Sequence, residues 1–457
     1  MLERGFYLEQ FKKDKKYYKR AISIAWPSVL ESFFIAFAGM IDSMMVAGLG
    51  SYAIAAVGLT TQPKFIFLAV FFAINTSQSA LVARRKGADD KKSANEIFLT
   101  AFTTAMILAV ITTAVSLYFI DDIIRISGSN ADTHSGATTY FFIIQAGMIF
   151  NVIAMVINSA QRGIGNTKIA FTTNLVSSIV NITFNYALIN GKFGLPQLGL
   201  KGAAIATVLG SMVAACMSIY SLFSKQNFIN IHYIIRKKIK PHLAPLRSIF
   251  DIGSTIFVEN IAMRIGFVAT ALTAAGLGTD PFAAYNAGMN LLGLTFSFAD
   301  GMQVAAVALT GNALGKGDKE QALKYGHVSQ RIGLAISIFL SIFLLVFGKN
   351  IMQLYFNQEH IIEMGVMITR FIVVIAILQI SQIIFGACLR AGGDIKFTLF
   401  ASLLSITIIR TTVTLVLVHV FDLGLVGVWL GILSDQLTRF TLLRFRFKTG
   451  KWLDIKI

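Results

Sequence analysis

Residues 48–56 read GLGSYAIAA, and residues 276–284 read GLGTDPFAA, 228 positions further along a chain of 457 residues. Near the end of each copy the offset falls by three, because LGLKG at 198–202 corresponds to LGLVG at 423–427. The chain is therefore a tandem duplication. In a membrane protein, such repeats usually enclose a substrate path at their interface. Other residues related by the offset of 228 include the pairs Gly87 and Gly315, Asp90 and Asp318, Arg162 and Arg390, and Gly165 and Gly393.

The composition is that of a membrane protein. Hydrophobic residues make up 55% of the chain and charged residues 14%, and the mean hydropathy is +0.69. A soluble domain has about 25% charged residues. Two distant cysteines exclude a disulfide framework, and the six histidines lack metal-binding spacing, so we expect neither an enzyme nor a cofactor. The net charge is +17, but the basic residues lie in short segments between apolar spans, which argues against nucleic-acid binding.

Twelve segments are long and apolar enough to span a bilayer, which takes about 20 residues. They lie near 21–47, 54–82, 95–119, 138–161, 168–190 and 200–222, and near 249–274, 281–312, 326–347, 364–388, 396–419 and 424–444. Six spans in each copy make the repeats parallel. The predicted fold is an all-α integral membrane protein with two six-helix bundles related by a pseudo-two-fold axis along the membrane normal. The predicted domains are 1–223 and 249–457, joined by a cytoplasmic linker at 224–248.

Lysine and arginine residues predict the orientation of the chain. With twelve spans, basic segments such as 12–20, 84–92, 316–324 and 444–451 all lie on one face, whereas the opposite loops are short or acidic. Both termini are therefore expected to be cytoplasmic, with the protein in the cell membrane of a prokaryote. Within the linker, the apolar and basic residues at 228–238 fit a short helix on the inner leaflet or an ordinary basic linker.

Polar side chains in the spans of the first half are candidates for the transport path, because polar groups in hydrocarbon are costly and face a cavity or a partner. One stripe along the fifth span consists of Asn174, Ser178, Asn181 and Asn185. The alternative for this stripe is interhelical hydrogen bonding. Further candidate cavity residues are Glu31, Asn75, Gln78, Asn151 and Asn158.

Asp42 lies near the end of the first span. A carboxylate there can bind a sodium ion or a proton, because desolvation favours its neutral form. The amide oxygens of Asn181 and Asn185 suit a hard cation. The alternative is a boundary aspartate that contacts headgroups or water. Phe37 and Met40 fit a cavity for bulky apolar cations, but they fit lipid contact equally well.

The second half does not repeat this chemistry. Glu259 corresponds to Glu31, but Thr270 corresponds to Asp42, and apolar residues replace both asparagines. Glu259 is therefore an alternative cation-coupling site. Further polar lining in this half consists of Asn286, Asn290, Gln379 and Gln382. The charged residues within or near its spans, expected to pair with one another, are Arg264, Asp300, Arg410 and Asp435.

The chain resembles the multidrug and toxic compound extrusion (MATE) family of antiporters over essentially its whole length. Besides the duplication, the resemblance rests on WPSVLESFFIAFAGMIDSMMVAGLG at 26–50, GLGTDPFAA at 276–284, QRGIGNTK at 161–168, LRAGGDIK at 389–396 and NITFNYALI at 181–189. It implies two six-helix bundles in a V that alternate between outward-open and inward-open forms. It also implies export of cationic, amphipathic compounds against a sodium or proton gradient.

Family roles carry over to individual residues. Asp42 matches the coupling aspartate of the first span, Asn181 and Asn185 match a fifth-span pair, and Thr207 matches a sixth-span hydroxyl. The seventh-span glutamate of some members matches Glu259. Two departures favour Asp42 for coupling.

Asn185 stands where part of the family has an aspartate, which leaves one carboxylate fewer for proton relay. Gln379 stands where another part has a tenth-span aspartate, which weakens a cation site at Glu259.

A flippase for a lipid-linked oligosaccharide or peptidoglycan precursor is the alternative function. Such an exporter needs cationic residues in its cavity to hold a pyrophosphate, and Arg264 and Arg410 keep this alternative open. Otherwise the expected partners are small amphipathic cations and membrane lipids. Na+ or H+ is expected as the coupling ion, and the resemblance implies a monomer.

Overall fold

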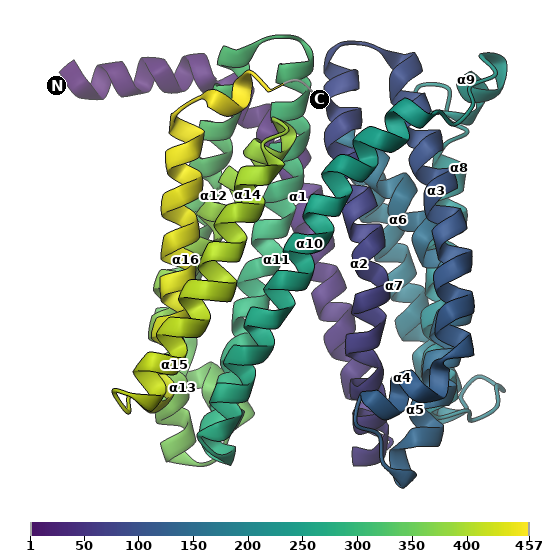
Figure 1. The fold of residues 1–457 in the computed structure, drawn as a ribbon, viewed down its shortest axis with the longest axis vertical. Helices are drawn as coiled ribbons and strands as arrows, with labels where there is room; N and C mark the ends of the chain where they lie inside the picture. The colour runs from purple at the N-terminus through teal and green to yellow at the C-terminus, as the bar shows by residue number, and fades with distance from the viewer. Residues whose placement is uncertain (1, 456–457) are drawn as a thin grey trace. The chain divides into compact units, whose positions relative to one another are not determined.

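The computed structural model describes residues 2–455, with side chains described from residue 15 onward except at residue 51. Helices joined by turns and loops make up these residues, and no strand occurs among them. The helices of the first copy and the linker are α1 (Leu2–Ala47), α2 (Ser51–Gly87), α3 (Lys91–Tyr118), α4 (Ile120–Ile126), α5 (Ala131–Ala146), α6 (Met148–Gly163), α7 (Thr167–Asn190), α8 (Leu200–Ser221) and α9 (Ile231–Arg236) (Figure 1).

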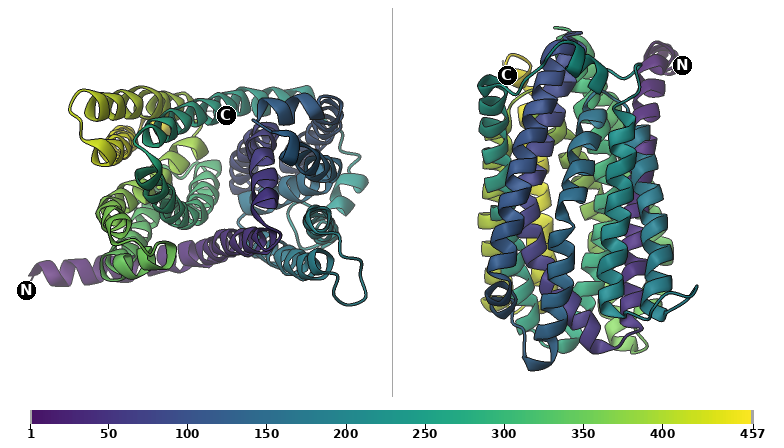
Figure 2. Two further views of the ribbon diagram at one scale, coloured as in Figure 1. Left: turned by 90° about the horizontal axis from the view of Figure 1, so that it is seen from below. Right: turned by 90° about the vertical axis from the view of Figure 1, so that its right-hand side faces the viewer.

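The second copy continues with a similar series of long helices. They are α10 (Leu243–Gly276), α11 (Thr279–Gly315), α12 (Lys319–Tyr355), α13 (Glu359–Ala391), α14 (Ile395–Ser402), the π-helix η1 (Leu403–Arg410), α15 (Thr411–His419), α16 (Gly424–Lys448) and the short 3₁₀ helix η2 (Lys451–Leu453). In Figure 2 this part of the chain is coloured from teal-green to yellow.

The chain folds as two compact units. The N unit comprises Leu30–Gly253, and the C unit comprises Met1–Val29 together with Ser254–Ile457. Each unit therefore includes part of the first long helix of the other copy. In the N unit, Gly253 of α10 lies against Ser77 of α2, where a larger side chain would crowd the serine hydroxyl.

Equivalent turns carry the duplication into the backbone. Gly50 precedes α2 with a φ of 103°, and Gly278 precedes α11 with a φ of 110°, a conformation that favours glycine. The side chains of Asp90 and Asp318 cap α3 and α12, each accepting a hydrogen bond from the backbone amide three residues on, at 2.9 and 2.8 Å. The same local signals therefore begin equivalent helices in both copies.

The helices are those of a membrane-spanning protein. Among the described residues, nine helices are long and apolar enough to cross a bilayer, or ten when the bent pair α5 and α6 is taken as one span. α7 and α16 have 24 and 25 residues and carry more polar side chains. The predicted count of twelve spans is consistent with this set.

Each unit contains one irregular span. In the N unit, α5 and α6 meet at a bend of 46° at Gly147, whereas the equivalent α13 is continuous. In the C unit, the π-helix η1 interrupts the span whose N-unit equivalent, α7, is a regular helix. Both irregularities adjoin polar clusters, as π-helical segments often do.

Both cores combine small and bulky buried residues. In the N unit, α2, α5 and α8 meet through fully buried alanines such as Ala53, Ala137 and Ala204, which allow close helix approach. In the C unit, the fully buried Trp429 of α16 packs with Ile368 of α13. Both cores fix the helices that carry the polar groups.

Candidate functional site

A chain of hydrogen bonds begins at Asp42 in the N unit. The Asn185 amide of α7 donates to the Asp42 carboxylate of α1. Asn185 also contacts the Asn181 oxygen at 3.4 Å, and Asn181 donates to the Thr207 hydroxyl of α8 at 3.3 Å. The structure thus brings the four predicted coupling residues together, because the i, i+4 spacing of the asparagines places both on one face of α7.

Two further groups complete this chain. The buried Tyr140 hydroxyl of α5 forms a hydrogen bond with Thr207 and interacts electrostatically with Asp42. Asn185 is fully buried, and its side-chain oxygen has no hydrogen-bond partner among the described residues. A buried oxygen without a donor is costly. This oxygen can therefore accept a hydrogen bond or coordinate a cation beside Asp42.

Sequence reasoning missed a second charge near Asp42. Lys64 of α2 is only partly exposed and interacts electrostatically with the Asp42 carboxylate. The signal was present in the sequence, because a lysine within an apolar span is by default a functional candidate.

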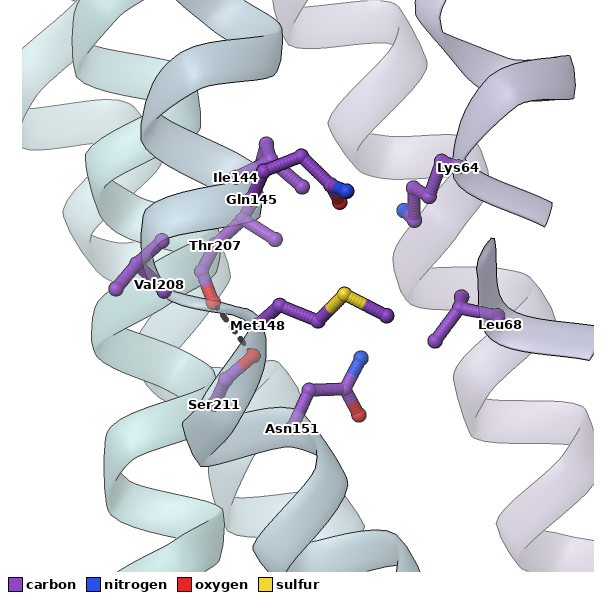
Figure 3. Close-up of a pocket in the computed structure, with 10 residues that line it drawn as sticks. Lys64, Leu68, Ile144, Gln145, Met148, Asn151, Thr207, Val208 and Ser211 are labelled. Atoms are coloured by element: carbon purple, nitrogen blue, oxygen red, sulfur yellow. Dashed lines mark hydrogen bonds between the residues drawn. The ribbon is translucent and has the colours of Figure 1, made fainter. Parts of the chain in front are cut away.

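Lys64 lines a small cavity between α2, α5, α6 and α8 (Figure 3). The cavity has a volume of about 30 Å³, which is enough for more than one water-sized group. It includes Gly147, so the bend between α5 and α6 shapes its wall. Its polar lining residues are Lys64, Gln145, Asn151, Thr207 and Ser211. Thr207 connects this cavity to the hydrogen-bond chain of Asp42.

Glu31 lies elsewhere in the N unit, in a buried ion pair. It is 3% exposed, and both Arg162 and the Asn174 amide donate to its carboxylate. The ion pair satisfies the carboxylate in place. Asp42 differs from Glu31, because its hydrogen-bond donor is a neutral amide.

The remaining predicted cavity residues of the N unit have separate environments. Gln78 is buried and donates to the Val156 carbonyl at 3.0 Å, and the buried Asn158 accepts a hydrogen bond from Ser218 at 3.2 Å. Both therefore join neighbouring helices. The partly exposed residue Asn75 has a buried side-chain oxygen without a partner among the described residues. Phe37 and Met40, the two apolar residues predicted for the cavity, are exposed.

Glu259 in the C unit has the same arrangement as Glu31. Arg390 donates to its carboxylate at 3.4 Å and Ser402 at 2.7 Å. Arg390 and Ser402 follow Arg162 and Asn174 at the repeat offset. The duplication therefore preserves a buried glutamate–arginine pair in each unit.

The position equivalent to Asp42 belongs to a buried ionic cluster in the C unit. Thr270 accepts a hydrogen bond from Arg410 at 2.9 Å, and Arg410 pairs with Asp435 at 3.6 Å. Arg439 also donates two hydrogen bonds to Asp435, both at 3.0 Å. The expectation that opposite charges in this half pair with one another is thus confirmed for Arg410 and Asp435. Arg410 is 1% exposed, so its charge faces Asp435 and protein atoms.

The other polar residues predicted in the C unit divide into buried and exposed groups. Gln379 is buried and accepts a hydrogen bond from Thr295 at 2.7 Å, and the buried Gln382 donates to Gln436 at 3.4 Å. Asn286 and Asn290 are exposed on α11, and Asn286 donates back to its own helix at Phe282. No cluster of three or more His, Cys, Asp or Glu side chains able to hold a metal occurs in the described part of the chain.

Comparison with known proteins identifies the family of this chain. The MatE family model matches residues 27–187 and 255–416. The chain belongs to the MatE family. The two matched blocks begin 228 residues apart, which confirms the duplication. MatE proteins are transporters, so this chain is a multi-pass membrane transporter and not an enzyme.

Relatives match this chain over almost its entire length. A probable multidrug resistance protein NorM from Thermotoga maritima is 27% identical, over 95% of this chain and 93% of its own length. The probable multidrug resistance protein YoeA from Bacillus subtilis is 23% identical, over 92% of this chain and 91% of its own. The predicted resemblance is therefore confirmed over the length on which it was based.

Solved structures show the fold. An outward-facing multidrug resistance MATE family transporter of the MOP superfamily has a TM-score of 0.88 at 23% identity, covering 95% of this chain and 97% of that one. A MOP superfamily transporter from Pyrococcus furiosus, in which reverse polarity of the binding pocket suggests a different function, has a TM-score of 0.87 at 24% identity and the same coverage. The predicted fold class, an all-α MATE membrane protein, is confirmed.

Proposed function

We propose that this protein is a Na+- or H+-coupled antiporter that exports amphipathic cationic drugs by alternating access, with Asp42 as its ion-coupling residue. The observation that carries the proposal is the environment of Asp42. A carboxylate held by a neutral amide lies beside the Asn185 oxygen, which lacks a donor among the described residues. Carboxylate and amide oxygens are ligands that hard cations prefer.

The coupling step is neutralisation of Asp42. A cation entering from outside binds the carboxylate, with Asn181, Asn185 and Thr207 as oxygen donors when the ion is sodium. Neutralisation weakens the attraction for a cationic drug and favours the inward-open state. An ion shifts this equilibrium only by its difference in affinity for the two states. One charge that crosses a potential of 100 mV supplies about 2.3 kcal/mol.

We also propose the location, the oligomeric state and the partners of the transporter. The lysine and arginine residues expected on one face support cytoplasmic termini, and the named relatives from Thermotoga maritima and Bacillus subtilis favour the cell membrane of a prokaryote. The monomer is the proposed working unit. Its partners are small amphipathic cations and membrane lipids, and it needs no cofactor beyond the coupling ion.

Efflux from proteoliposomes tests the proposal. Proteoliposomes that contain either the wild type or the Asp42→Asn variant are loaded with ethidium, and sodium and proton gradients are imposed separately. We expect one gradient to drive efflux in the wild type and at least a tenfold loss in Asp42→Asn. Asp122→Asn, which removes an exposed carboxylate outside the spans, is the matched control and should behave as wild type. Gradient-driven efflux at the wild-type rate in Asp42→Asn would refute the assignment.

A further inference from the structure

Two nitrogen groups face each other across the small cavity of the N unit. The Lys64 side chain of α2 and the Gln145 side chain of α5 point toward one another from opposite walls (Figure 3). Gln145 is 1% exposed, and its amide nitrogen has no hydrogen-bond partner among the described residues. An ammonium offers donors only, and an amide nitrogen does the same. The space between them therefore suits an acceptor.

A negatively charged acceptor fits the two donors best. A buried donor that lacks an acceptor costs about 1–3 kcal/mol, and a partly buried ammonium favours an anionic partner. The volume of about 30 Å³ holds two water-sized groups, which is the size of the two oxygens of a carboxylate. Asn151 and Ser211 line the same cavity and can orient such a group.

We infer that Lys64 and Gln145 form a subsite for the carboxylate of a transported amphipath. This inference rests on the proposed function, because Asp42 then holds the cationic group of the same molecule. Lys64 and Asp42 interact electrostatically, so a simple cation meets opposing charges there, whereas a molecule with both charges complements the pair. Lys64 and Gln145 are thus specificity-determining residues that favour zwitterions over their uncharged-ester counterparts.

A matched pair of dyes tests the inference by direct binding. Rhodamine B carries a carboxylate on a cationic dye, and its ethyl ester lacks only that charge. Fluorescence polarisation of the purified full-length protein measures the affinity for each dye without any gradient. We expect wild type to bind rhodamine B about tenfold more tightly than the ester, the size of one charged hydrogen bond.

Two variants separate the subsite from general binding. Lys64→Met should abolish the preference, because it should weaken the binding of rhodamine B and strengthen the binding of the ester. Gln145→Leu should lower the preference several-fold and leave the ester unchanged, which keeps the test valid if Lys64→Met does not fold. Lys192→Met, which removes an exposed lysine after α7, is the control and should retain the wild-type ratio.

Specific outcomes overturn the inference. An unchanged dye ratio in both variants would do so, even if gradient-driven efflux through Asp42 were established. Measurements at low and at high chloride concentration identify the source of the anion. Equal ratios at the two concentrations support the substrate carboxylate, whereas loss of rhodamine B binding at high chloride alone would assign the subsite to an inorganic anion instead.

Discussion

The N unit and the C unit share a backbone plan but use charge in opposite ways. In the N unit, Asp42 accepts a hydrogen bond from an amide, and Lys64 acts on it through space. In the C unit, Asp435 is held directly by Arg410 and Arg439. In the mechanism proposed above, only the first arrangement leaves a carboxylate whose charge an arriving cation neutralises. The comparison teaches that the two units keep one fold, while the partners of their carboxylates have diverged.

The irregular spans follow the same division. The bend at Gly147 adjoins the cavity of the N unit, where the buried amide nitrogen of Gln145 has no partner among the described residues. In the C unit, the π-helix η1 ends at Arg410, which binds both Thr270 and Asp435. One irregularity therefore shapes a cavity, and the other places a side chain in an ionic cluster.

The largest expected effect on stability is in the C unit. Arg410→Met leaves Asp435 buried with one arginine and removes the donor to Thr270. Breaking a buried ion pair costs about 3–5 kcal/mol, so we expect a markedly lower melting temperature in detergent. Asp42→Asn should lower it little, because an amide can replace the carboxylate beside Asn185. Equal losses in the two variants would erase the contrast between the units.

The paired glutamates should respond alike and by a smaller amount. Glu31→Gln and Glu259→Gln each deprive a largely buried arginine of its anion, at a cost of about 2 kcal/mol. Thermal melting of both variants checks the size, and efflux under each gradient checks the function. If Glu259→Gln kept its stability but lost the ion dependence of efflux, coupling would belong to the C unit.

Removal of the helix caps should cause the smallest loss of stability, and the loss should be similar in the two units. Asp90→Ala and Asp318→Ala each remove a cap, and the melting temperature near neutral pH should report a loss of about 1 kcal/mol in both. Partial burial raises the pKa of Asp90, but the hydrogen bonds from Ser93 and the charges of Arg85 and Lys92 outweigh it, so the pKa lies below its ordinary value.

A lowered pKa also predicts how the Asp90 cap depends on pH. Its contribution is present above the ordinary aspartate pKa of about 3.9 and is lost as pH falls through the lowered value. Thermal melting at a series of pH values should therefore show wild type and Asp90→Ala converging in strongly acidic solution. A difference that persists there would contradict the cap as its cause.

Much of the fold could be predicted because the same local sequence signals occur in both copies. Glycines before α2 and α11, aspartates before α3 and α12, and long apolar runs specify equivalent helices in both copies. The bend at Gly147 and the π-helix η1 could not be predicted, because tertiary packing fixes them. Gly147 lies against Val208 of α8, a contact that no local pattern reveals.

The site was predictable where its residues share one helix. Asn181 and Asn185 stand one turn apart on α7, Asp42 stood out as a carboxylate near the end of the first span, and the resemblance supplied Thr207. Lys64 and Gln145 belong to different helices, and only the fold places them across one cavity. Glu31 and Glu259 were polar residues in spans by sequence, and the structure shows that each has its own arginine.

Ion–drug competition tests the central claim, that the ion acts at Asp42 in the N unit. Ethidium affinity of the purified protein is measured by fluorescence while the sodium concentration and the pH are varied, in wild type, Asp42→Asn and Glu259→Gln. We predict that the coupling ion weakens ethidium binding in wild type and Glu259→Gln, and that Asp42→Asn abolishes this dependence. Competition that persists in Asp42→Asn and disappears in Glu259→Gln would contradict the account.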